Sequence, residues 1–281
     1  MIVANCLVIE TGIHFKLLRL NNWVIASFFM LLNACLGFTY ESIEAGVVSS
    51  CVACFLFMLF LTYKSPDNVK ATYSGYLALG IASLIFLPIL FFVPPLWLIG
   101  LLLLQSLSLR SWLASLLGIL TPYWLAFPWF LYQQSQEVSA IHFPLFQLDG
   151  MASGNSPFMP VQLIVLGMII VLTLIGAFNF WSKSYQENIQ TRLFFNCFQW
   201  MGLAVVIAIL LLPQHFHTLI RMLLLFACPF IAHFFALSRS KIINIVFFIT
   251  MVFIVVLSLI SVHHHSLLNE ANETLYQLWN G

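Results

Sequence analysis

Charged side chains are scarce in this chain. Asp, Glu, Lys and Arg together make up 7% of its 281 residues, whereas a soluble domain carries about a quarter. The stretch from Tyr73 to Tyr132 contains a single formal charge, Arg110. So much Leu, Ile and Phe with so little charge excludes an ordinary soluble domain and indicates a protein embedded in lipid.

An excess of either charge sign is also lacking. The 10 basic and 9 acidic residues provide no basic surface, so we expect no nucleic-acid partner. The six cysteines lie mostly inside apolar runs, where a thiol behaves as a small hydrophobic group, and His263-His264-His265 has no carboxylate or cysteine at ligand spacing. We therefore predict no disulfide framework, no metal site and no cofactor.

Apolar windows long enough to cross a bilayer, about 30 Å at 1.5 Å per residue, recur along the whole chain. They lie at 23–40, 43–63, 73–93, 95–109, 111–131, 161–181, 194–213, 217–236 and 242–262, of which the fourth is short. The predicted fold is all-α: one integral membrane domain over residues 1–281, forming a polytopic transmembrane helix bundle of about nine spans. Because Pro94-Pro95 join the third and fourth windows, those two form either separate spans or a re-entrant hairpin, which leaves seven spans.

Basic residues mark one side of the predicted bundle, since short cytoplasmic loops collect Lys and Arg. Nine of the 10 basic residues precede the first window or follow the second, fourth, sixth and eighth. The exception is Arg221. The pattern predicts an N-inside, C-outside topology in the bacterial inner (cytoplasmic) membrane, as a multi-pass protein.

Two segments outside the windows are assigned to the outer surface. The segment 133–160 contains the apolar patch Ile141–Phe146, and we expect it to form an outer interfacial loop. The segment 263–281 carries leucines and a tryptophan at amphipathic spacing and is predicted to form an outer amphipathic tail.

Prolines and small residues shape the predicted helices. Pro88, Pro122 and Pro229 fall near the middle of their windows and should kink the helices there. The kinks either line a mid-membrane cavity, beside Ser83 and Thr121, or are the ordinary kinks of spanning helices. Small residues of the 111–131 window allow close helix approach, so the bundle is predicted to pack around that helix.

The best candidate for a functional site is Arg221, which follows His215 and His217 near the outer face. An arginine there can snorkel to the interface and form paired hydrogen bonds with a phosphate or carboxylate. The alternative is a structural partner, either Glu41 or Glu44, or a lipid headgroup. We keep both interpretations at this point.

Glu41 and Glu44 follow the first window directly. Their place resembles that of the catalytic carboxylate in the first outer loop of membrane glycosyltransferases that use polyprenyl-phosphate sugars, although the large loop of those enzymes is missing here. The alternative, which we favour, is a polar turn between two spans. Arg110 belongs to a belt of polar residues on the cytoplasmic side, which either forms hydrogen bonds between helices or surrounds a headgroup pocket at Arg110.

Four apolar runs carry a resemblance to a known family. They are Gly80–Pro88, Ser108–Trp112, Leu117–Tyr123 and Ala232–Ser238. With them the chain resembles a family of uncharacterised multi-spanning inner-membrane proteins of the Bacteroidetes group, which implies the localisation and the fold but no activity.

Two functions follow from these observations as hypotheses. The first is the transport, flipping or group transfer of a lipid-linked or amphipathic anionic substrate, because the spans have no midplane carboxylate for ion coupling. The alternative is a non-catalytic membrane scaffold subunit of a cell-envelope complex. The expected partners are membrane lipid and other envelope membrane proteins. No catalytic residue can be assigned, and whether the protein is an enzyme stays open.

Overall fold

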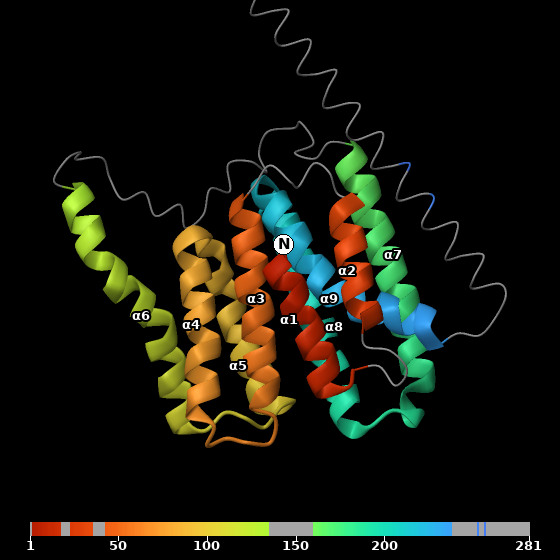
Figure 1. The fold of residues 1–281 in the computed structure, drawn as a ribbon, viewed down its shortest axis with the longest axis horizontal. Coiled ribbons are helices and arrows are strands. Elements are labelled where there is room, and N and C mark those ends of the chain that lie inside the picture. The colour runs from red at the N-terminus through yellow and green to blue at the C-terminus, as the bar shows by residue number, and fades with distance from the viewer. Residues whose placement is uncertain are drawn as a thin grey trace, which may run out of the picture.

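A computed structural model describes residues 2–17, 23–35, 43–134 and 160–237, together with Val252 and Val256. Within these residues every regular element is helical, which confirms the predicted all-α helix bundle (Figure 1). The α-helices are α1 (Ile2–Phe15), α2 (Trp23–Cys35), α3 (Ile43–Leu61), α4 (Val69–Ile85), α5 (Val93–Leu102), α6 (Leu109–Gln134), α7 (Pro160–Lys183), α8 (Ile189–Leu211) and α9 (Phe216–Leu237). The short 3-10 helices are η2 (Leu87–Phe92), η4 (Ser184–Gln186) and η5 (Pro213–His215).

Four of the described helices are long and apolar enough to cross a membrane by length and composition. They are Ile43–Leu61, Leu163–Lys183, Ile189–Leu211 and Pro213–Ala236. The other apolar helices are shorter, at 10–17 residues. Because about 20 residues are needed to cross the hydrocarbon core, the prediction of about nine spans goes beyond this finding.

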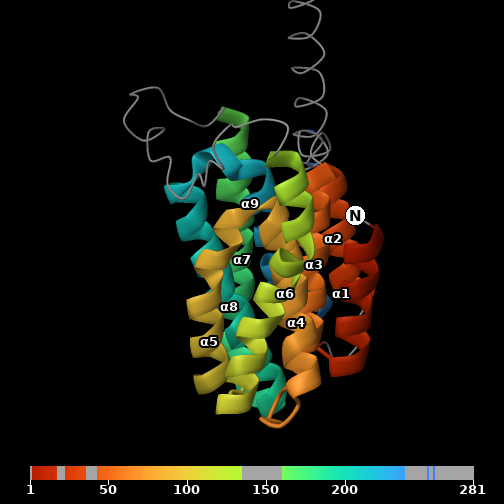
Figure 2. The same ribbon diagram turned by 90° about the vertical axis from the view of Figure 1, so that its left-hand side faces the viewer.

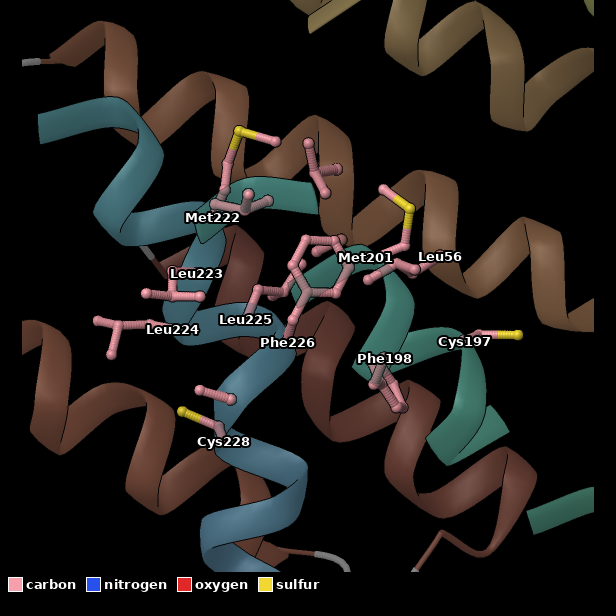
Figure 3. Packing of buried hydrophobic residues seen from close by; sticks show 14 of the residues in the cluster. Leu56, Cys197, Phe198, Met201, Met222, Leu223, Leu224, Leu225, Phe226 and Cys228 are labelled. Atoms are coloured by element: carbon pink, nitrogen blue, oxygen red, sulfur yellow. The ribbon is translucent and has the colours of Figure 1, made fainter. Parts of the chain in front are cut away.

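The helix α9 forms the centre of the bundle. Every residue from 219 to 233 is buried, and α9 packs against α2, α3, α7 and α8. Figure 3 shows Phe226 of α9 directed toward Met201 and Phe198 of α8, with Leu56 of α3 beside them. We predicted that the helix of the 111–131 window forms the centre of the bundle, and this prediction is wrong. The helix that is buried on all sides is α9.

The helix α6 instead lies at the edge of the bundle, as the two views in Figures 1 and 2 show. It packs extensively against α4. The small residues predicted to allow close approach do so on this one face, where Ala114, Ser115 and Gly118 are buried. The opposite face exposes large side chains, including Leu117 at 59% and Trp124 at 74%.

Pro88 ends a helix rather than kinking one. The helix α4 stops at Ile85, and Pro88 stands near the start of η2. A proline at this place cannot donate a backbone hydrogen bond, and its ring would clash with the carbonyl of Leu84 in a continuous helix. The window 73–93 is therefore divided in two, whereas Pro122 and Pro229 stay inside α6 and α9, as predicted.

The helix α1 was not predicted, because its 14 residues are too few for a spanning window and include Glu10. It packs against α2 and α3 as part of the bundle. Figure 1 places its first residue toward the end of the bundle at which α3 and α9 begin. The predicted outer loop over 133–160, the window 242–262 and the tail over 263–281 fall almost wholly outside the described residues and stay predictions.

The two ends of the bundle differ in chemistry. The turns 62–68, 103–108 and 184–188 lie together at one end (Figure 1). We call it the basic end, because basic residues lie in or beside these turns: Lys64, Lys70, Arg110, Lys183 and Arg192. At the other end, which we call the histidine end, α3 and α9 begin and η5 joins α8 to α9.

Candidate functional site

Four of the six predicted site residues lie at the histidine end: Glu44, His215, His217 and Arg221. They come from the first turn of α3, from η5 and from the first two turns of α9. The helices α3 and α9 pack against each other. The fold thus brings together residues that are more than 170 positions apart in the sequence.

The remaining two predicted residues do not join this group. Arg110 is exposed in the first turn of α6, which starts at the basic end (Figure 1). It is therefore separated from Arg221 by the length of the bundle. Glu41 lies outside the described residues.

Arg221 is buried inside the bundle, with 2% of its surface exposed. Leu225 and Pro229 follow it at spacings of four residues, which places all three on one face of α9. Leu225 and Pro229 line a small cavity together with residues of α1, α2 and α3, among them Ile25 and Leu56. The Arg221 face of α9 therefore looks toward α1, α2 and α3, and the expected position at the lipid edge is wrong.

His215 lies where polar and apolar surroundings meet. Its ring packs edge-on against the ring of Phe86, with a distance of 5.1 Å between the centroids. The charge on Glu44 acts on His215 electrostatically. Glu44 is exposed at the start of α3, so it supplies a negative charge near His215.

An apolar cavity of about 250 Å³ adjoins this group. Its walls come from η2 and α5 on one side and from α8 and the start of α9 on the other: Pro88, Phe92, Pro95, Ala208, Leu212 and Leu219 among them. Phe91, Ile207 and Leu211 also line it and are about half exposed, so the cavity opens sideways. His215 stands three residues after Leu212, and its ring packs on Phe86, two residues before Pro88, so His215 lies beside this cavity. His217 precedes Arg221 by four residues and shares its face of α9.

The hydroxyls predicted beside a mid-membrane cavity belong to a helix interface instead. The hydroxyl of Tyr123 donates to Oγ of Ser83, at 2.9 Å. The Tyr73 hydroxyl and Oγ1 of Thr121 are 3.1 Å apart and share a hydrogen bond. Both pairs join α4 to α6, which supports the structural interpretation of these residues.

Cysteines and histidines show no further chemistry in the described part of the chain. Cys51 and Cys54 are half-buried free thiols on α3. No group of three His, Cys, Asp or Glu side chains that could hold a metal ion occurs among the described residues. His263-His264-His265 lies outside them.

The chain matches no protein-family model, and comparison with curated proteins and with solved structures also gave no match. Its function must therefore be argued from its own residues. Sequence reasoning found the polar residues of the histidine end but missed the cavity, because its walls are ordinary apolar side chains from two distant segments. Pro88 and Pro95 gave the one usable signal, since a proline interrupts the backbone hydrogen bonds of a helix and marks a break between elements.

Proposed function

We propose that this chain is a multi-pass protein of the bacterial inner membrane, with the basic end in the cytoplasm and about nine spans between residues 23 and 262. The gathering of the turns 62–68, 103–108 and 184–188 at one end supports the sidedness, because cytoplasmic loops collect Lys and Arg. The resemblance to inner-membrane proteins of the Bacteroidetes group belongs to the same proposal. With this sidedness the start of α1 lies toward the outer end, which departs from the predicted N-inside topology.

The function we propose is the handling of a lipid-linked or amphipathic anionic molecule at the histidine end, by transport, flipping or group transfer. One observation carries it: the apolar cavity opens sideways and has His215 beside it. Sites for small molecules are mostly apolar with a few convergent polar groups. An acyl or prenyl chain fits the cavity, and imidazole N–H groups can donate hydrogen bonds to a phosphate.

Arg221 has a different part in this proposal. It lies two positions after Leu219, about 200° further round α9, and its face looks toward α1, α2 and α3. His217 precedes Arg221 by four residues and shares that face. We therefore assign the headgroup contact to His215 and give Arg221 a structural role. Its buried positive charge still adds to the potential that attracts an anion to this end.

Lipid retained on purification tests this function. The full chain is extracted in mild detergent, and the bound lipids are identified by mass spectrometry. We expect a phosphate-bearing lipid to be retained by the wild type and lost from Ala208→Phe, which places a bulky side chain in the cavity, and from His215→Ala. The matched control is Gly167→Phe, because a side chain at Gly167 meets open space.

If these variants keep the same lipid as the wild type, the cavity is not the site.

The alternative function, a scaffold subunit of a cell-envelope complex, is favoured by the exposed apolar face of α6. A stoichiometric membrane-protein partner, copurifying with the wild type and lost when Leu117 and Trp124 are replaced by Ala, would support that alternative.

A further inference from the structure

A second apolar groove lies on the other side of α9 from the Arg221 face. Its volume is about 200 Å³, and its walls come from α7, α8 and α9: Thr173, Ala177, Gln199, Gly202, Leu223 and Phe226 among them. The helices α7 and α8 each pack extensively on α9. Leu174 is 63% exposed and Leu203 is 53% exposed, so the groove also opens sideways.

The groove has a polar boundary toward the basic end. The indole Nε1 of Trp181 donates to Oε1 of Gln199 at 2.7 Å, joining α7 to α8. Tryptophan with its N–H satisfied is typical of the membrane interface, where one part of the ring system is apolar and the other polar. The pair marks the level at which hydrocarbon gives way to headgroups.

Arg192 lies beyond this boundary on the same face of α8. It precedes Gln199 by seven residues, which is two helical turns or about 10 Å along the axis. Gln199 in turn precedes Val206, another lining residue, by seven residues. The three side chains therefore share one face of the helix. The Nε atom of Arg192 is buried and makes no hydrogen bond within the part of the chain that the structure describes. Such a buried donor is costly unless it meets an acceptor.

The surroundings of Arg192 favour an anionic acceptor. Asn188 caps α8 without a side-chain hydrogen bond, so the first N–H groups of the 23-residue helix and its dipole point to the same place. Lys183 and Arg192 outnumber Glu187 in this turn. Helical side chains lean toward the helix N-terminus, which directs Arg192 away from the groove and to the headgroup level.

We propose that the α7–α8 groove is a binding site for an anionic phospholipid, whose acyl chain lies along Ile170–Ala177 and Gln199–Val206 and whose phosphate contacts Arg192. Complementary charge and the shared face of α8 identify this occupant: the apolar groove lies about two helical turns from a cation with an unused donor. Basic pockets between spanning helices take phosphate headgroups in this way. The site is at the basic end, so it stands or falls separately from the function proposed at the histidine end.

The test uses phosphatidylglycerol with a photoactivatable acyl chain, added to the full chain in phosphatidylcholine nanodiscs. We expect cross-linked peptides to map to Ile170–Ala177 and Gln199–Val206. Unlabelled phosphatidylglycerol should compete, whereas extra phosphatidylcholine and soluble glycerol 3-phosphate should not. Arg192→Gln should weaken labelling of the groove about tenfold, the change expected for one lost hydrogen bond to a charged group.

Three further variants make the result specific. Arg192→Lys keeps the charge and should retain most of the labelling. Gly202→Phe should abolish it by filling the groove, since a Cβ at Gly202 has ordinary contact, 3.6 Å, with Phe226 Cβ and the larger ring extends beyond it. The matched control Arg110→Gln removes an exposed cation at the same end of the bundle and should leave labelling unchanged. Thermal unfolding in lipid-free detergent verifies that each variant is folded.

Several results would overturn the proposal. They are even labelling around the bundle, equal competition by phosphatidylcholine, competition by glycerol 3-phosphate alone, and unchanged labelling in folded Arg192→Gln. Cross-linking of this groove to a second copy of the chain would likewise assign it to a protein interface rather than to lipid.

Discussion

Gly80 of α4 and Gly118 of α6 lie against each other's helices with no room for a side chain. A Cβ atom on Gly80 would stand 3.1 Å from the carbonyl oxygen of Gly118 and 2.8 Å from that of Ile119. A Cβ on Gly118 would stand 2.7 Å from the carbonyl oxygen of Tyr73. Because these neighbours are backbone atoms, neither helix can yield without moving as a whole. The edge helix α6 is thus held against α4 by close packing of the two backbones.

Gly118→Ala should therefore separate α4 from α6. We expect the free energy of unfolding to fall by about 1 to 3 kcal/mol, the range for overpacking, although alanine is the better helix former by about 1 kcal/mol. Thermal unfolding in detergent measures the loss. Gly167→Ala is the control, because its Cβ meets no atom of the described residues within 4 Å, and it should be neutral or stabilising. Equal stability of Gly118→Ala and the wild type would contradict the packing.

The hydrogen bond from Tyr123 to Ser83 should contribute measurably to the same interface. Tyr123→Phe removes the donor at 2.9 Å and leaves the ring in place. Hydrogen bonds between spanning helices average about 0.6 kcal/mol, so we expect a coupling energy of that size in the double-mutant cycle with Ser83→Ala. Ser83 also donates to the carbonyl oxygen of Gly80, so the single Ser83→Ala variant should lose more than the coupling energy. A coupling energy of zero would show that the two hydroxyls do not interact.

The sequence predicts this interface better than it predicts the bundle. Small residues at four-residue spacing indicate that a helix packs closely, and Ala114 and Gly118 do so. The spacing does not say how many neighbours the helix has. The burial of α9 depends on four partner helices, whereas its sequence resembles that of any apolar span. For this reason composition identified the fold class, and the choice of the central helix was wrong.

The candidate site, like the fold, was predicted from the sequence only in part. Glu44, His215 and Arg221 attract notice in the sequence because polar residues are rare near apolar runs, and the fold places them at one end. The depth of Arg221 depends on the face of α9 that it occupies and on the helices covering that face. Neither the cavity beside His215 nor the groove above Arg192 has a sequence pattern, since each is a space between elements distant in the chain.

Sidedness can be tested with single cysteines in a variant whose six native cysteines are replaced. Ser65→Cys lies in the exposed turn after α3, and Glu44→Cys is exposed at the other end of that helix. If the basic end is cytoplasmic, a maleimide that cannot cross the inner membrane should label Glu44→Cys in cells whose outer membrane alone has been permeabilised. Ser65→Cys should react only after lysis. Labelling of Ser65→Cys in intact cells would reverse the proposed orientation.

Arg221 is buried and Arg110 is exposed, and this difference leads to opposite expectations. Arg221 is 2% exposed, and a buried guanidinium persists only where surrounding groups compensate its charge. Arg221→Gln leaves those groups uncompensated and should lower the free energy of unfolding by about 3 kcal/mol or more. Arg110→Gln, at an exposed position, should change it by about 0.5 kcal/mol at most.

The compensating group can be identified from the same background. Glu44 and Glu41 are the acidic residues closest in sequence to the start of α3, which packs on α9. If either carboxylate balances Arg221, then Glu44→Gln or Glu41→Gln added to Arg221→Gln should restore part of the stability, because the leftover negative charge is removed. Thermal unfolding of the single and double variants provides the comparison. Arg221→Gln with wild-type stability, together with loss of the phenotype that the intact gene supports, would instead assign Arg221 to the bound anion.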